Sequence, residues 1–355
     1  MPFSRHSRQV LSAVSLGLVL AACGEGEAAP LAESAPEIGS ARFDDRFKLV
    51  RSVTLEQPDS ALIVRVSGID LDSRGRILIG DVSEGNVKLF ARDGRLLRVI
   101  GRKGMGPGEF EQPRYPRFGP DGLIYVADAQ NPRVQVFDTT GALVAATPVL
   151  TLGLIQGFRP LQGRRLLLAV ESTEAREVLA ELDMDGHVRR RMLAVGEIRP
   201  TGQPEDPAWG NLRAFSLSVK DDTAFVSNTV SDSLWMVSLS SGDVRRLHLP
   251  FPGYVHPAAP TARHATIQEL IRWSHGFHLS STLSVSEGGL YLPYVRGVLN
   301  KGDPILLVTR SPSGEWQALA ESPPVIGTYD GGPVVLLSPG QEEIRIGLFR
   351  PRANP

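Results

Sequence analysis

Cysteine is almost absent from this sequence of 355 residues, in which Cys23 is the only one. A single thiol excludes an intramolecular disulfide and a cysteine-rich metal site. Because Cys23 lies near the N-terminus, the folded part of the chain also has no thiol nucleophile. An excess of charge is missing as well, with 38 basic and 39 acidic residues. We therefore expect no nucleic-acid partner, since such proteins usually carry a basic surface.

Common catalytic motifs are also missing: the sequence has no H-E-x-x-H pair, no serine nucleophile elbow and no phosphate loop. His264, His275 and His278 come close together in the sequence, but a metal site around His278 would need further ligands from elsewhere. Asp70 and Asp330 are the available carboxylates. Solvated or capping histidines are the simpler interpretation, and we expect no cofactor unless such a site holds a divalent metal.

The apolar run Val10–Leu20 is about half the length needed to span a bilayer. Arg5 and Arg8 precede it, and Leu20-Ala21-Ala22-Cys23 follows. These segments resemble a bacterial lipoprotein signal peptide with its lipobox, in which the cysteine receives a lipid and becomes the N-terminus. An ordinary signal peptide with an accidental cysteine is the alternative.

The lipobox resemblance implies a signal peptide over residues 1–22 and lipidation at Cys23. Residues 23–44 are rich in Gly, Ala, Glu, Pro and Ser, which predicts a flexible tether. Without Arg5 and Arg8 the chain has 36 basic and 39 acidic residues, a net charge of −3. We expect a lipid-anchored protein of the bacterial cell envelope, at the outer membrane facing the periplasm or at the cell surface if the host is diderm.

The rest of the chain contains an internal repeat with an offset of 47 residues. When the chain is aligned with itself at this offset, six residues of the first copy are identical to those of the second. They are Gly75, Ile77, Asp81, Phe90, Gly94 and Leu96, aligned with Gly122, Ile124, Asp128, Phe137, Gly141 and Leu143. Each copy alternates apolar and polar residues between turns, which predicts an antiparallel meander. Several such sheets in a ring would cover each other's faces, as in a β-propeller.

The second copy has the more specific pattern. A Gly- and Pro-rich connection, Gly104–Pro113, precedes the strand Ile124–Asp128, and Arg133–Phe137 follows as the next strand. Over Gly104–Gly141 the chain resembles the NHL-repeat family, whose propeller units share these segments. The resemblance implies an NHL-like propeller. RNA-binding members of that family present a basic face, whereas some members act as metal-dependent lyases or lactonases.

The number of blades can be predicted from the hairpin turns in the sequence. Five turns end in a glycine between two strands, at Gly94, Gly141, Gly186, Gly242 and Gly314. The sixth blade can be assembled from Pro333–Leu337 and Glu343–Phe349, with the N-terminal segment Phe47–Leu55 as its outer strand. We therefore predict an all-β fold over residues 45–355, a six-bladed propeller of four-stranded antiparallel blades closed by the N-terminal strand.

Two insertions interrupt the repeat. Glu197–Trp209 is expected to be a loop, and Pro250–Phe277 contains Thr266–Trp273, whose apolar residues recur at helical spacing. Asp81 and Asp128 end equivalent strands, and the simplest interpretation is that they accept hydrogen bonds from the following turns. Asp183-Met184-Asp185-Gly186 is interpreted as a hairpin turn, because the next positions lack the ligands of a calcium loop.

The most specific hypothesis about a binding site rests on four arginines. They lie in or beside the predicted innermost strands of four blades, at Arg65, Arg117, Arg159 and Arg213. Converging guanidinium groups would bind an anion, and we expect Arg117, Arg159, Arg213 and His278 to become neighbours at one mouth of the channel. Ion pairing with nearby acids is the alternative.

The sequence thus favours a cell-envelope lipoprotein whose propeller is a binding scaffold for an envelope protein or a small anionic ligand rather than an enzyme. A metal-dependent lyase or lactonase is the alternative function.

Overall fold

The computed structural model describes residues 41–149, 152–171, 176–198, 214–249, 251, 254–255, 276–296, 305–339 and 343–352. The expected signal peptide, Cys23, most of the tether and the predicted helix Thr266–Trp273 lie outside these residues. Within them, no helix is long and apolar enough to cross a membrane.

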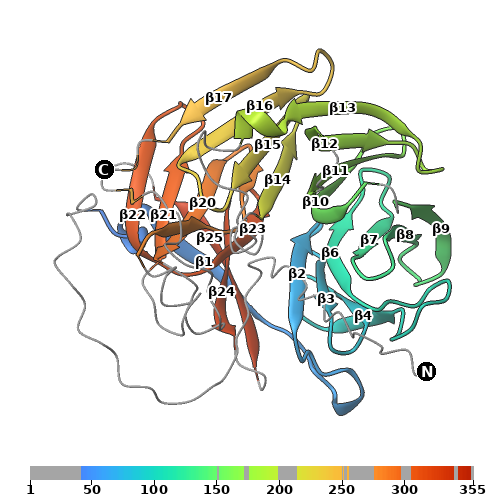
Figure 1. Ribbon diagram of the computed structural model, residues 1–355. Coiled ribbons are helices and arrows are strands. Elements are labelled where there is room, and N and C mark those ends of the chain that lie inside the picture. Colours follow the sequence, from blue (N-terminus) through green and yellow to red (C-terminus); the bar gives the residue numbers. More distant parts are fainter. Residues whose placement is uncertain are drawn as a thin grey trace, which may run out of the picture.

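In the described residues the strands form six antiparallel sheets arranged in a ring (Figure 1). The first three blades follow each other along the chain, each from its inner to its outer strand. Blade 1 is β2(Val66–Leu71), β3(Ile77–Asp81), β4(Asn86–Phe90) and β5(Leu96–Ile100); blade 2 is β6(Pro113–Phe118), β7(Ile124–Asp128), β8(Arg133–Phe137) and β9(Leu143–Pro148); blade 3 is β10(Leu154–Leu161), β11(Arg165–Glu171), β12(Glu177–Leu182) and β13(Val188–Ala194).

The other three blades complete the ring, and the innermost strand of blade 5 is split in two. Blade 4 is β14(Phe215–Lys220), β15(Thr223–Asn228), β16(Ser233–Ser238) and β17(Val244–His248); blade 5 is β18(His278–Ser280) with β19(Ser284–Ser286), then β20(Gly289–Arg296), β21(Ile305–Arg310) and β22(Trp316–Ser322); blade 6 is β23(Val325–Tyr329), β24(Gly332–Pro339), β25(Ile344–Pro351) and β1(Phe47–Thr54). The predicted six-bladed propeller is therefore confirmed. Short helices are α1(Phe43–Arg46), the 3-10 helix Asp59–Ala61 and α2(Val195–Ile198).

The N-terminal strand closes the ring as predicted. β1 pairs antiparallel with β25, from Phe47 opposite Pro351 to Thr54 opposite Arg345. In Figure 1 the blue strand β1 lies beside the red strand β25. The two ends of the chain thus form one blade, so no blade lacks its outer strand.

The ordered fold begins before the boundary expected at residue 45. Phe43 is 1% exposed and its ring lies 4.9 Å from that of Phe47 and 5.1 Å from that of Phe349. Ala41 also packs against this cluster. Residues 41–44 therefore belong to the propeller, because an apolar side chain in this stretch fills a gap between blades 5 and 6.

The core lies mainly between neighbouring blades. Ile124 and Val126 of blade 2, for example, cluster with Leu78 and Leu89 of blade 1, and Phe110 from the connection between them is fully buried. Both faces of the middle strands are therefore apolar, in agreement with the sequence pattern.

The five predicted hairpin glycines all adopt positive φ, between +85° and +93°. A side chain there would be strained, and at two of them it would also collide with the preceding blade. A Cβ at Gly94 would lie 2.0 Å from the Thr54 carbonyl oxygen, and one at Gly186 would lie 2.4 Å from that of Pro148. The turns thus need glycine both for backbone conformation and for close packing between blades.

Asp81 and Asp128 lock their blades, as the sequence indicated. Asp128, fully buried, accepts hydrogen bonds from the Gln112 backbone N–H at 2.9 Å and the Asn131 side chain at 3.0 Å. The Asp183 carboxylate accepts from two backbone N–H groups of its own turn, which agrees with the hairpin interpretation.

Candidate functional site: a positively charged channel

Three charged residues occupy one level of the central channel. Backbone pairing places Asp70 opposite Leu78, Arg117 opposite Tyr125, and Arg159 opposite Leu167. These three partners are equivalent, because each packs towards the following blade. Asp70, Arg117 and Arg159 are therefore matching positions on the inner strands of three successive blades, and the 47-residue offset places Arg117 on Asp70.

The two arginines have few partners. Arg117 donates from Nη1 to the carbonyl oxygens of Ile69 at 3.2 Å and Pro116 at 2.9 Å, while its buried Nε has no partner in the structure. Arg159 donates from Nη1 to the Phe158 carbonyl oxygen at 2.9 Å. Neither guanidinium forms an ion pair with a carboxylate of the described residues, and most of their N–H donors remain available to a ligand.

Asp70 compensates this charge only in part. It accepts a hydrogen bond from the Phe118 backbone N–H at 2.8 Å. Burial raises the pKa of Asp70, and the nearby Arg117 and Arg159 oppose that rise. Even with Asp70 ionised, two guanidinium groups face one carboxylate.

Burial is also unfavourable for both guanidinium groups. It lowers the pKa of Arg117, an effect that the negative charge of Asp70 opposes. It lowers the pKa of Arg159 as well, and there the positive charge of Arg117 acts in the same direction. Such shifts are expected where a cation is short of counter-charge, so an added anion would stabilise this level of the channel.

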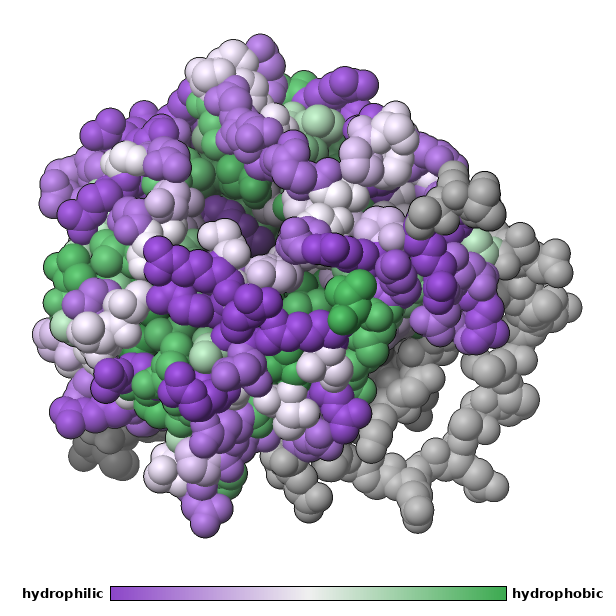
Figure 2. Space-filling view, turned by 180° about the vertical axis from the view of Figure 1, so that it is seen from behind, coloured by the Kyte–Doolittle hydropathy of each residue, from purple (hydrophilic) through white to green (hydrophobic). Residues whose placement is uncertain are grey.

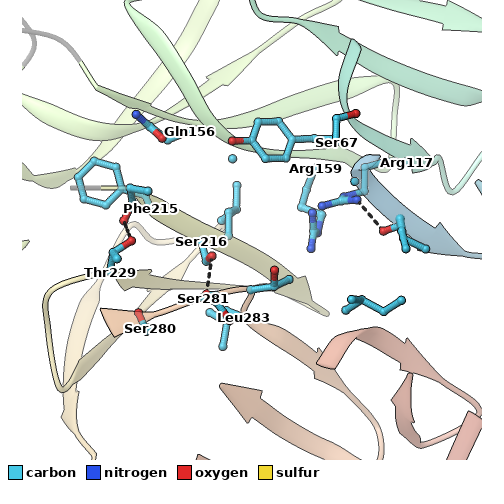
Figure 3. Close-up of a pocket in the computed structure, with 18 of the residues that line it drawn as sticks. Ser67, Arg117, Gln156, Arg159, Phe215, Ser216, Thr229, Ser280, Ser281 and Leu283 are labelled. Atoms are coloured by element: carbon cyan, nitrogen blue, oxygen red, sulfur yellow. Dashed lines mark hydrogen bonds between the residues drawn. The ribbon is translucent and has the colours of Figure 1, made fainter. Parts of the chain in front are cut away.

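Arg117 and Arg159 line a cavity between the inner strands, with a volume of about 110 Å³. A single water occupies roughly 10–15 Å³ on this measure, so the cavity has room for several waters or a small ligand. Figure 3 shows the guanidinium groups of Arg117 and Arg159 side by side in this space. From the back of the ring, Figure 2 shows a hollow near the middle of the face, with hydrophilic residues inside it.

The rest of the cavity lining is uncharged and combines apolar side chains, such as Phe215 and Leu283, with polar groups. The Ser216 hydroxyl donates to the Ser281 carbonyl oxygen at 2.9 Å, and the Thr229 hydroxyl donates to that of Ala214 at 2.9 Å. Gln156 is 3% exposed, donates to Glu171 at 2.9 Å, and its buried Oε1 has no partner. This side therefore offers hydrogen-bond acceptors.

The structure brings together only two of the four residues predicted for the site. Arg117 and Arg159 meet, whereas Arg213 lies outside the described residues. Arg65, also considered from the sequence, precedes β2 and is exposed to solvent. The position on β2 that matches the two arginines is Asp70.

His278 does not line the cavity that contains Arg117 and Arg159. Its Nδ1 accepts a hydrogen bond from the Val255 backbone N–H at 3.1 Å. Its ring is 9% exposed and packs 4.9 Å from Phe251 and 5.8 Å from Tyr254. β18 places the imidazole in an aromatic cluster, where it has a structural role.

Sequence reasoning missed Gln156, Ser216 and Thr229. They lie in blades whose repeats have diverged, so no offset marks them. The only sequence feature that could have indicated them is a polar residue within or beside an inner strand, such as Gln156.

Comparison with known proteins agrees with the fold. A family model described as a 6-bladed beta-propeller matches residues 33–115, and no curated protein matches the sequence. A member of the DUF4221 family from Bacteroides vulgatus superposes with a TM-score of 0.66 at 10% identity, covering 87% of this chain and 99% of its own.

Two further solved structures are similar. A candidate exported protein from Bacteroides fragilis has a TM-score of 0.63 at 14% identity, covering 89% of this chain and 98% of its own. A candidate gluconolactonase has a TM-score of 0.51 at 12% identity, covering 87% and 96%. At these identities the similarity shows the fold alone. The protein is a six-bladed β-propeller with a positively charged central channel.

Proposed function

We propose that the protein is an envelope lipoprotein whose propeller binds a small anionic ligand in its channel. The observation that supports this most is the pair of guanidinium groups, Arg117 and Arg159, which among the described residues face a single carboxylate and have N–H donors without partners. Buried cations without counter-ions are unfavourable. An anion bound in the cavity would supply the missing counter-charge.

The same observation disfavours the metal-dependent alternative at this position. A divalent cation would be repelled by two guanidinium groups. The described residues that line the cavity also include no carboxylate and no imidazole. The name of one structural neighbour points to a lactonase, but no described residue of this channel supports that chemistry here.

Replacing Arg117 and Arg159 together by Met tests the anion site. Met retains much of the volume but donates no hydrogen bonds. Each charge-assisted hydrogen bond contributes about 1.5–3 kcal/mol. Losing one from each arginine should weaken the binding of hexanoate, used as a probe in calorimetry, by about a hundredfold or more. The melting temperature should stay the same or rise, because two poorly compensated buried charges are removed.

Two controls accompany this test. Arg191→Met removes an exposed arginine from the outer strand β13 and should leave binding unchanged. Asp70→Asn removes the negative charge nearest the two arginines and should tighten hexanoate binding. If the double variant binds hexanoate as well as the wild type does, the anion site is refuted.

Membrane attachment is tested separately. Cys23→Ser removes the thiol that the lipid would modify, so we expect the variant to move from the membrane fraction to the soluble fraction on cell fractionation. An unchanged membrane fraction would contradict the lipoprotein proposal. Ala22→Gly, a small residue for a small residue, is the control that should remain membrane-bound.

A further inference from the structure

We infer that the channel ligand is an elongated monocarboxylate that carries an uncharged hydrogen-bond donor, such as a hydroxyl or amide N–H, at the end remote from its carboxylate. This inference rests on the proposed anion site and adds the nature of the rest of the ligand. Its basis is the chemistry of the two sides of the cavity.

The charge of the site favours a monoanion. Arg117 and Arg159 contribute two positive charges, and Asp70 on the matching strand position contributes one negative charge when it is ionised. A carboxylate would bring this level of the channel to neutrality, whereas a phosphate dianion would leave it negative. Two guanidinium groups also suit the two oxygens of a carboxylate.

The other side of the cavity favours donors on the ligand. The hydroxyl protons of Ser216, Thr229 and Ser280 are already used, since each donates to a backbone carbonyl oxygen. Their oxygens therefore face a ligand as acceptors. In Figure 3, Gln156 and Thr229 lie at the left of the view, and Ser216 lies between Thr229 and the two arginines.

Gln156 supplies the independent observation that points to a ligand. Its side chain is 3% exposed, its Nε2 is fixed by Glu171 at 2.9 Å, and its Oε1 is buried without a partner. A buried acceptor without a donor is costly. A donor on a ligand in the cavity would satisfy it.

The donor should be uncharged and several bonds away from the carboxylate. No carboxylate is among the described cavity-lining residues, and the nearby Glu171 carboxylate already accepts from Gln156 Nε2, so an ammonium group in the cavity would have no carboxylate in the lining to pair with. Gln156 and Arg159 are three residues apart on β10, which corresponds to roughly 10 Å along a regular strand. The bulge between Ile155 and Gly157 shortens this distance.

Four six-carbon probes separate these features on the wild-type protein: hexanoate, 6-hydroxyhexanoate, 6-aminohexanoate and 1,6-hexanediol. We expect 6-hydroxyhexanoate to bind about three- to tenfold more tightly than hexanoate, as one hydrogen bond to a buried acceptor would give. 6-Aminohexanoate should bind more weakly than 6-hydroxyhexanoate. 1,6-Hexanediol, which lacks the carboxylate, should show no measurable binding.

Variants locate the effect. Gln156→Met should abolish the preference for 6-hydroxyhexanoate while leaving hexanoate affinity nearly unchanged. Thr229→Val, a substitution of similar shape in another blade, should reduce the preference for 6-hydroxyhexanoate over hexanoate. It replaces Gln156→Met as the test if that variant does not fold.

The outcomes separate the two proposals. Equal affinity for hexanoate and 6-hydroxyhexanoate, or tightest binding of 6-aminohexanoate, would overturn the inference and leave the anion site standing. No binding of any carboxylate would refute the anion site itself.

Discussion

Deleting residues 46–55 should unfold or aggregate the protein. The deletion removes β1, which pairs with β25 along its length and contributes the buried side chains of Phe47, Val53 and Leu55. Burying one large apolar side chain contributes about 1.5–3 kcal/mol. Losing three of them removes stabilisation comparable to the whole free energy of unfolding of a typical domain, about 5–15 kcal/mol. It also exposes the edge of β25 to pairing with other chains.

Point variants make this prediction quantitative. Phe47→Ala should lower the free energy of unfolding by about 3–5 kcal/mol, because Phe47 is 5% exposed and packs on Phe43 and Tyr291. Lys48→Ala, at the next and exposed position of the same strand, should change it by less than about 0.5 kcal/mol. Chemical denaturation measures both. A deletion variant that stays monomeric with an unchanged melting temperature would contradict the importance of this closure.

Asp81→Ala should destabilise blade 1 by about 3–5 kcal/mol, because it leaves the buried Lys88 ammonium without its counter-charge. The Asp81 carboxylate is fully buried and lies 3.2 Å from Lys88 Nζ. It also accepts hydrogen bonds from the backbone N–H groups of Val64 at 2.8 Å, Arg65 at 3.1 Å and Ser83 at 3.0 Å. These bonds tie the entry to β2 to the turn after β3.

The repeat itself provides the matched comparison. Asp128 matches Asp81, but Gln135 stands where blade 1 has Lys88. Asp128→Ala should therefore lower the free energy of unfolding less than Asp81→Ala does. The cation near Asp128 is Arg133, at 3.8 Å, which is partly exposed and also donates to the carbonyl oxygens of Gly106 and Glu109, whereas Lys88 is fully buried. Adding Lys88→Met to Asp81→Ala should recover part of the loss. If the two aspartates cost the same in urea denaturation, the Lys88 ion pair does not contribute as argued.

The architecture of the described residues could be predicted from the sequence alone. Alternating strands, glycine turns and the repeat predicted six blades and the pairing of the N-terminal strand with the C-terminal one. This worked because the pattern of a strand and the residues of a tight turn are local requirements. Asp81 and Asp128 were interpreted correctly for the same reason, since their partners lie in nearby turns.

Which residues share the channel depends on the three-dimensional arrangement of the blades. Inner strands contain bulges, as between Arg114 and Arg117 or between Ile155 and Gly157, and an extra residue changes which side chains point the same way. Sequence spacing therefore placed Arg117 and Arg159 correctly but assigned His278, on the short strand β18, to the same group. The positions of Asp70 beside the arginines and of Gln156 in the same cavity depend on how six blades close around one axis, which no local pattern records.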